Sequence, residues 1–123
     1  MVESIGVDIV EVDRIRESVQ RWGQRFLKRV FTPREIEYCL GQGNRYTSLA
    51  ARFAAKEAVS KAIGPQIGIN WTDVEIVNTH HGKPEVKLKG KAAQATTGKE
   101  ILLSLSHTRS YAVAVAVLRK KEE

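Results

Sequence analysis

Two carboxylates lie in segments whose other residues are typical of a protein interior. Asp8 is at the centre of Ser4 to Glu11, which alternates like a β-strand, and Gly6 on the same face leaves space beside the acid. Glu57 is in Ser48 to Ile63, which holds mostly good helix formers and no Pro or Gly. A buried carboxylate is unfavourable by several kcal/mol unless a cation meets it. Each acid therefore needs a partner within the fold or a chemical task.

The two acids have a structural interpretation and a functional one. Lys61, one helical turn after Glu57, could be its ion-pair partner, and Asp8 could pair with an Arg or with backbone N–H groups. Two acids from distant parts of the chain also suit Mg²⁺, which binds through one or two carboxylates together with substrate phosphates. Arg45, in a predicted loop, and Ser106-His107-Thr108, at a predicted strand end, could bind those phosphates. The sequence therefore indicates a site that handles phosphate groups.

The composition bounds the kind of protein. The chain has 123 residues, the size of one domain (residues 1–123), and 42% of them are hydrophobic. No apolar run approaches the roughly 20 residues that span a membrane, and the strand pattern from Ser4 leaves no room for a signal peptide. Cys39 is the only cysteine, which excludes an internal disulfide and fits a reducing compartment. We therefore expect a cytoplasmic protein.

The charge suggests an acidic partner. The net charge is +6, which suits a nucleic acid, an acidic protein or a phosphate-rich small molecule. Asp13 can cap a helix that runs to Trp22 along an apolar stripe, and Gly23 should end or bend this helix. If the helix continues, three cations share one face and form a docking surface for the partner. They are Arg14, Arg21 and Arg25.

The later segments predict helices first and strands afterwards. Thr32-Pro33-Arg34-Glu35 is a capping box, so a helix should run from Pro33 to about Leu40 with Glu35 as a cap. Gly41 to Thr47 is predicted to be the loop that contains Arg45. The elements expected after the central helix are strands at Trp71 to Val77, Glu85 to Lys89, Ile101 to Ser106 and Tyr111 to Leu118, and a short helix at Lys91 to Thr97. This order predicts one α+β domain in which a mainly antiparallel sheet packs on a long central helix.

Several motifs resemble those of a known family, the holo-[acyl-carrier-protein] synthases, which are the short, bacterial-type 4′-phosphopantetheinyl transferases. The matching segments are Gly6 to Glu11, Arg52 to Ala58 followed by Ser60-Lys61-Ala62, Ser104 to Thr108, Phe31 to Glu35, and Gly82-Lys83-Pro84. Their order and spacing also agree, so the resemblance covers nearly the whole chain. One loop departs from the pattern, because Gly64-Pro65-Gln66-Ile67-Gly68 stands where the family usually has Gly-Thr-Gly-Ile-Gly, near the path of coenzyme A.

The resemblance implies a 4′-phosphopantetheinyl transferase-like fold and an activity. Similar enzymes transfer the 4′-phosphopantetheine group of coenzyme A to a serine of apo-acyl carrier protein in fatty acid biosynthesis, and release adenosine 3′,5′-bisphosphate. Asp8 and Glu57 would hold Mg²⁺, Glu57 or a water on the metal would accept the serine proton, and Lys61 would neutralise phosphate oxygens or assist the leaving group. Arg45, Ser106, His107 and Thr108 would bind the nucleotide phosphates, and Arg14, Arg21 and Arg25 would dock the acidic carrier protein. The family's short members are homotrimers with sites between subunits.

Two other classes of protein remain open. A small nucleic-acid-binding module would use the same positive charge, with basic residues interleaved with exposed aromatics on a sheet. A non-catalytic interaction domain would leave Asp8 and Glu57 without a chemical task. The enzyme interpretation expects neither a nucleic acid nor a membrane as a partner.

Overall fold

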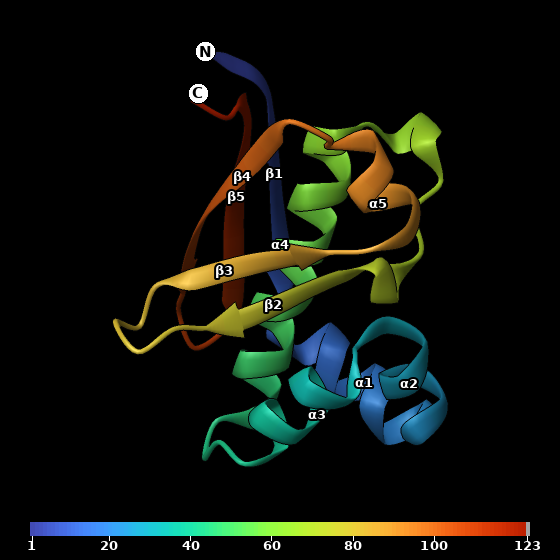
Figure 1. The fold of residues 1–123 in the computed structure, drawn as a ribbon. Coiled ribbons are helices and arrows are strands. Elements are labelled where there is room, and N and C mark those ends of the chain that lie inside the picture. Colours follow the sequence, from blue (N-terminus) through green and yellow to red (C-terminus); the bar gives the residue numbers. More distant parts are fainter. Residues whose placement is uncertain (123) are drawn as a thin grey trace.

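A long helix, α4 (Arg45–Ile63), runs through the centre of the fold (Figure 1). The structure is a computed structural model that describes residues 1–122. The other helices are α1 (Val12–Trp22), α2 (Gln24–Val30), α3 (Pro33–Leu40) and α5 (Gly90–Ala95), with 3₁₀ turns η1 (Pro65–Ile67) and η2 (Trp71–Asp73). The strands are β1 (Val2–Glu11), β2 (Val74–Asn78), β3 (Pro84–Leu88), β4 (Lys99–His107) and β5 (Tyr111–Lys120). No helix in this part of the chain is both long enough and apolar enough to cross a membrane.

The strands form two antiparallel sheets. The larger has the order β1-β5-β4, so the first strand of the chain pairs with the last one. The smaller is the hairpin β2-β3, which runs across α4 (Figure 1). Helices therefore concentrate in the first half of the chain and strands in the second. This confirms the predicted α+β fold, with a mainly antiparallel sheet packed on a long central helix.

Small side chains lie between α4 and the larger sheet. Along β5, Ala112, Ala114 and Ala116 are fully buried and alternate with more exposed residues. The buried alanines of α4 are Ala50, Ala51, Ala54, Ala55, Ala58 and Ala62. Because the packed surfaces carry few long side chains, the helix can approach the strands closely.

The approach is closest at Gly6 of β1. A Cβ atom at this position would lie 1.9 Å from the carbonyl oxygen of Ala58 and 2.8 Å from the backbone nitrogen of Ala62. Only glycine permits such a distance between a strand and a helix backbone. The prediction that Gly6 leaves open space beside Asp8 is therefore wrong, because the backbone of α4 occupies that space.

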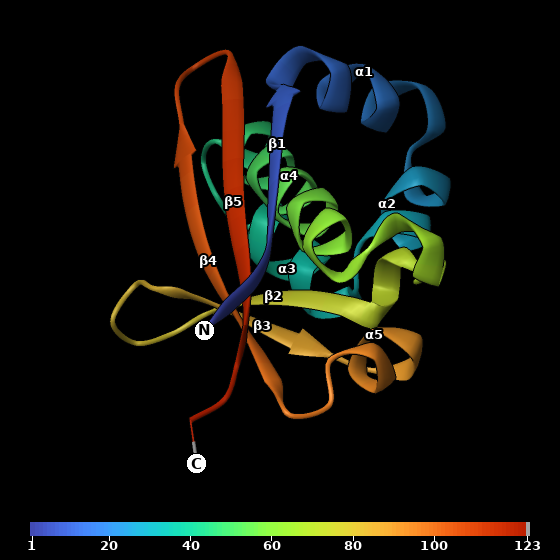
Figure 2. The same cartoon turned by 90° about the horizontal axis from the view of Figure 1, so that it is seen from above.

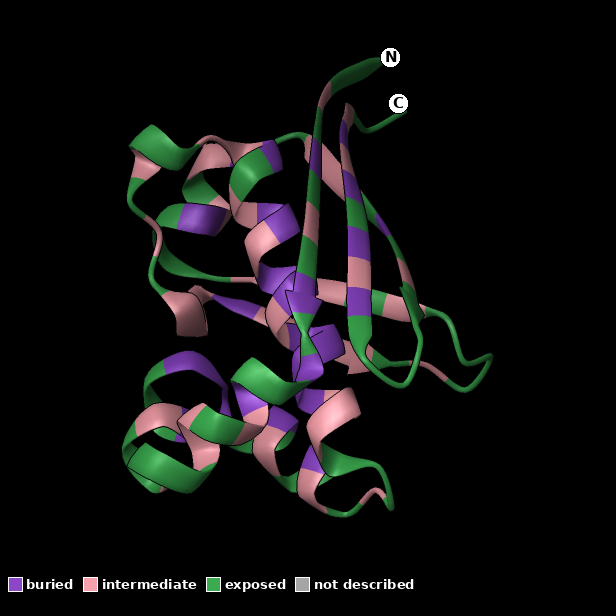
Figure 3. Cartoon of the chain, turned by 180° about the vertical axis from the view of Figure 1, so that it is seen from behind, coloured by how far each residue is buried: buried purple, intermediate pink, exposed green. Residues whose placement is uncertain are grey.

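The other face of the larger sheet is uncovered. Figure 2 shows the helices on one side of β1, β5 and β4, with no helix on the opposite side. Ile5, Val7 and Ile9 are each more than half exposed on this face, and Leu102 and Val115 are exposed on β4 and β5. Exposed and buried residues alternate along β5 in Figure 3. The chain thus presents aliphatic side chains that the described residues do not cover.

The start of α1 differs from the prediction. The N-cap residue is Glu11, which makes no side-chain cap bond, whereas Asp13 lies inside the first turn and pairs with Arg16. The predicted cap at Asp13 is therefore wrong. Val12 is buried and its backbone N–H donates to the carbonyl of Ser110, so the β4–β5 turn binds one of the free N–H groups at the start of the helix.

The end of α1 separates the cations that were predicted to share one docking surface. Gly23 ends the helix with φ of 55°, as expected, but α2 then begins in a new direction. Arg25 therefore lies on α2 and does not continue the α1 face of Arg14 and Arg21. Trp22, predicted to belong to the apolar stripe, is 51% exposed.

The first residue of α4 also differs from the prediction, whereas the start of α3 agrees with it. The capping box of α3 is present as predicted, with Thr32 accepting from the N–H of Glu35 and Glu35 accepting from the N–H of Thr32. The central helix, predicted to begin at Ser48, begins at Arg45. Arg45 is therefore a helical residue and does not lie in the loop.

We expect Gly6→Ala to lower the free energy of unfolding by roughly 3 kcal/mol, because the new methyl group must push α4 away from β1. Urea unfolding followed by circular dichroism measures this loss. Gly43→Ala is the matched control, since a Cβ at Gly43 meets nothing within 4 Å. Equal stability of the two variants would contradict the close approach.

Candidate active site

Asp8 and Glu57 line the same cavity, which has a volume of about 530 Å³. Asp8 comes from the middle of β1 and Glu57 from the middle of α4, the two elements that meet at Gly6. Arg14 of α1 lines the cavity as well. The remaining lining residues are Ile9, Val10, Glu11, Ile15, Ser18, Phe26, Phe53 and Tyr111. The site thus has a charged part and a largely apolar wall.

Lys61 is the cation nearest to the pair. Its Nζ lies 3.2 Å from Oδ1 of Asp8 and donates to the carbonyl of Val7 at 3.0 Å. The sequence suggested Glu57 as its ion-pair partner, whereas the ion pair in the structure is with Asp8. The side chain of Asp8 is 16% exposed and that of Lys61 49% exposed, so the lysine approaches the acid from the solvent side.

Glu57 has no such cation of its own. Burial raises its pKa above the ordinary value, and the negative charge of Asp8 raises the pKa further, whereas Lys61 lowers it. Two like charges therefore share a partly desolvated site that holds one lysine. Raised pKa values of this kind are common at functional sites.

The arrangement fits a magnesium-type cation. Oxygen donors from two carboxylates, with open space beside them for water and phosphate, match the coordination that Mg²⁺ prefers. A divalent cation between Asp8 and Glu57 would also remove the repulsion that raises the pKa of Glu57. Within residues 1–122 no group of three or more His, Cys, Asp or Glu side chains could hold a metal alone. The protein can thus supply two ligands, and the others must come from water and substrate.

The predicted phosphate-binding residues do not line this cavity. Arg45, at the first turn of α4, is about 18 Å along the helix axis from Glu57. Ser106 pairs with Val113, which pairs with Ile9, so Ser106 lies on the uncovered face of the sheet. Asp8 points to the opposite face, since side chains alternate along a strand. One chain therefore does not bring Arg45 and Ser106 to the carboxylates.

His107 and Thr108 lie at the turn between β4 and β5. His107 ends β4 and is exposed. Thr108 has a structural role, because its Oγ1 accepts from the N–H groups of Ser110 and Tyr111 at 3.3 and 3.1 Å. Neither residue lines the cavity of Asp8 and Glu57.

The uncovered sheet face does not resemble a nucleic-acid platform. Its exposed side chains are mainly aliphatic, and Arg119 on this face is paired with Glu100 at 2.7 Å. A sheet that stacks bases would present aromatic and basic residues. The expectation for a nucleic-acid-binding module is therefore not met here.

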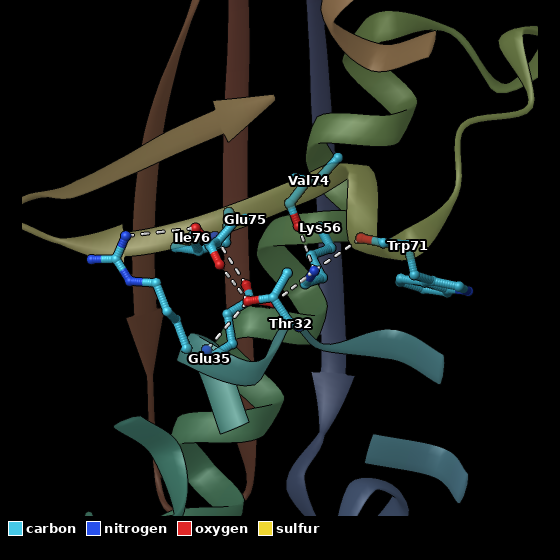
Figure 4. Close-up of polar contacts among 8 residues, drawn as sticks. Thr32, Glu35, Lys56, Trp71, Val74, Glu75 and Ile76 are labelled. Carbon is cyan, nitrogen blue, oxygen red and sulfur yellow. Dashed lines mark hydrogen bonds and ion pairs between the residues drawn. The ribbon is translucent and has the colours of Figure 1, made fainter. Parts of the chain in front are cut away.

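A buried ion pair that the sequence patterns do not predict lies next to Glu57. Nζ of Lys56 lies 2.8 Å from Oε1 of Glu35, and the two side chains are 1% and 0% exposed (Figure 4). The capping box explained Glu35 without a further partner, so only the position of Lys56 among the interior alanines of α4 pointed to this contact. Arg52, a second buried cation of α4, stacks on Tyr38 at 4.3 Å.

Comparison with known proteins identifies the class. Residues 4–116 match the 4'-phosphopantetheinyl transferase superfamily, and the chain belongs to it. Within this superfamily the chain is similar to holo-[acyl-carrier-protein] synthases. The protein of that name from Koribacter versatilis is 48% identical over 123 residues, which cover 96% of this chain and 98% of that protein.

Solved structures of holo-[acyl-carrier-protein] synthases are also similar to this chain. The crystal structure of Helicobacter pylori holo-[acyl-carrier-protein] synthase in complex with coenzyme A superposes with a TM-score of 0.83 at 31% identity. The superposition covers 94% of this chain and 99% of the Helicobacter pylori chain. The Neisseria meningitidis enzyme gives a TM-score of 0.86 at 32% identity, covering 98% and 100%. The predicted 4′-phosphopantetheinyl transferase-like fold is therefore confirmed.

We expect Glu57→Gln to raise the melting temperature at pH 7 in the absence of divalent cations. A carboxyl whose pKa is raised by folding destabilises the fold when ionised, and this cost grows as the pH rises from the ordinary value of 4.5 through the raised value. The difference between variant and wild type should thus vanish at pH 4.

Thermal unfolding at both pH values, with and without Mg²⁺, measures this effect. Mg²⁺ should stabilise the wild type and leave Glu57→Gln unchanged. A variant that is less stable than the wild type at pH 7 would contradict the assignment of like-charge repulsion.

Proposed function

We propose that this protein acts as a holo-[acyl-carrier-protein] synthase with its reaction centre at Asp8 and Glu57. The enzyme transfers the 4′-phosphopantetheine group of coenzyme A to a serine of apo-acyl carrier protein and so serves fatty acid biosynthesis. The products are holo-acyl carrier protein and adenosine 3′,5′-bisphosphate. The observation that carries the proposal is two acids from distant segments lining one cavity, in a chain similar to named synthases over nearly its whole length.

Asp8, Glu57 and the neighbouring Lys61 each have a task in this proposal. Asp8 and Glu57 hold Mg²⁺, which supplies positive charge to the diphosphate of coenzyme A and to the leaving group. Lys61, half exposed beside Asp8, contacts phosphate oxygens. As the serine hydroxyl oxygen bonds to the β-phosphorus, the bond from that phosphorus to the bridging oxygen breaks. Glu57, or a water on the metal, accepts the serine proton.

The acidic carrier protein docks on the cations of α1 and α2. Arg14 lines the cavity, while Arg21 and Arg25 are exposed beyond it. Arg14 and Arg21 belong to α1 and Arg25 to α2, so the proposed docking surface extends over two helices. Complementary charge at such a surface mainly sets the association rate and the register of the partner.

The site is completed by a neighbouring subunit in a homotrimer. Five exposed aliphatic side chains lie on the uncovered sheet face, and such patches commonly mark interfaces between proteins. The residues expected to bind the nucleotide, which one chain leaves away from the carboxylates, then act from the neighbour. They are Arg45, Ser106, His107 and Thr108. A cytoplasmic location is also part of the proposal and is supported by the free thiol of Cys39.

The proposal predicts a mass gain of one phosphopantetheine group when apo-carrier protein is incubated with enzyme, coenzyme A and Mg²⁺. Asp8→Asn and Glu57→Gln should each lower the rate by at least about a hundredfold, because either change removes one of two protein ligands. Mass spectrometry of the carrier measures this. Glu85→Gln, which removes an acid that does not line the cavity, is the control. Carrier that stays unmodified with the wild type would refute the proposal.

Charge reversal at Arg21 tests the docking surface without touching the cavity. Arg21→Glu should raise KM for carrier protein about tenfold and leave KM for coenzyme A unchanged, since it repels only the acidic partner. Lys87→Glu on β3 carries the same charge change elsewhere and serves as the control. If both variants raise KM for carrier protein equally, net charge rather than docking explains the effect.

The trimer is tested by introducing a charge on the uncovered face. Sedimentation equilibrium should give a trimer for the wild type and a monomer for Ile5→Lys, because a buried unpaired lysine opposes association. Glu85→Lys, exposed on β3, should remain trimeric. A monomeric wild type with full transfer activity would overturn this part of the proposal.

A further inference from the structure

The buried ammonium group of Lys56 has all of its hydrogen-bond partners within the protein. The Lys56 ammonium group contacts Oε1 of Glu35 and donates to the carbonyls of Trp71, at 2.9 Å, and Val74 (Figure 4). An ammonium group has three donors, and all three have partners here. Lys56 therefore has no donor left for a substrate, and its role is not direct contact with the reacting groups.

Glu35 extends the contact to further elements. Its Oε1 also accepts from the N–H of Thr32, and its Oε2 accepts from the N–H of Ile76 at 2.9 Å. The pair thus joins α3, α4, η2 and β2 (Figure 4). Buried polar networks whose members are all satisfied are rigid and directional.

Such a directional contact matters for α4. The helix packs largely through alanines, whose small, smooth side chains fix its distance from the sheet better than its rotation. Lys56 is anchored at a single point by acceptors from three segments. Consecutive helical residues point about 100° apart. Fixing the rotation of α4 at Lys56 therefore fixes the direction of Glu57.

The hydrogen bonds of Lys56 also position residues 69–74, which face Glu57 across a second cavity. The Trp71 carbonyl that accepts from Lys56 belongs to a residue whose ring lies 5.0 Å from that of Phe53, a wall residue of the cavity. A second cavity of about 180 Å³ is lined by Lys56, Glu57 and Ser60 on α4 and by Ile69, Asn70, Trp71 and Val74 facing them. Glu57 therefore lines both cavities, and the hydrogen bonds of Lys56 help to fix the position of Trp71 beside them.

We propose that the buried Lys56–Glu35 pair is the positioning element for Glu57, holding its carboxylate toward Asp8 so that the two acids can share one divalent cation. Lys56 and Glu35 are positioning residues, not catalytic residues. The inference rests on the proposed function, because it takes metal binding as the task of Glu57. It adds that the strength of this binding is set by two side chains that touch neither metal nor substrate.

The test uses the double variant Glu35→Gln/Lys56→Met. Removing both charges avoids leaving one of them buried and unpaired, so the chain should still fold. Leu103→Ala on β4 is the control, since it creates a cavity in the core that is expected to lower stability without touching the pair. Mg²⁺ affinity by calorimetry and stability by urea unfolding are measured for both variants and the wild type.

The double variant should bind Mg²⁺ about tenfold to a hundredfold more weakly, with lower kcat and unchanged KM for carrier protein. Leu103→Ala should lose stability but keep the wild-type Mg²⁺ affinity. Wild-type Mg²⁺ affinity in the double variant would overturn the inference and leave the proposed function intact. A wild-type protein that neither binds Mg²⁺ nor transfers phosphopantetheine would overturn both.

Discussion

The close approach of β1 to α4 at Gly6 is the constraint on which the site depends. Asp8 is two residues from Gly6 along the strand, and Glu57 is the residue before Ala58, whose carbonyl lies against the glycine. The separation of the two carboxylates is therefore set by two backbones in contact, and only secondarily by side-chain rotamers. Backbones of regular elements move little, so this is an effective way to hold two like charges near each other.

The two carboxylates of the site lower the stability of the fold. Glu57 is partly desolvated and near another acid, and Lys61 offsets part of their charge. The surrounding interior provides the rigidity that tolerates this arrangement, through close alanine packing and a fully satisfied buried ion pair. Local rules of protein stability are commonly broken at functional sites and offset elsewhere in the fold.

Local patterns in the sequence predicted much of this structure. The capping box at Thr32 and the end of α1 at Gly23 follow from interactions within a few residues, and alternation predicted the strands of the larger sheet. The unusual positions of Asp8 and Glu57 predicted a shared site, and both acids line one cavity. These features depend on short-range chemistry, or on a charge in a place where charges are unfavourable.

Other features depend on tertiary packing, which local patterns do not contain. Lys61 has the helical spacing to pair with Glu57, yet β1 brings Asp8 closer to its ammonium group. Trp22 has the spacing of a core residue, but the chain turns at Gly23 and leaves it exposed. The capping box accounts for Glu35 locally, so no local pattern predicts its pairing with Lys56 on another helix.

The ion pair of Lys61 with Asp8 has a consequence for the order of events at the site. A lysine on a flexible stem acts as a tethered counter-ion that occupies the acid before any ligand arrives. In the proposed complex Asp8 would hold the cation, and the ammonium group of Lys61 would be able to contact the diphosphate instead. One side chain would thus offset the charge of Asp8 in the ion pair and that of the substrate in the complex, with no net charge gained or lost by the protein.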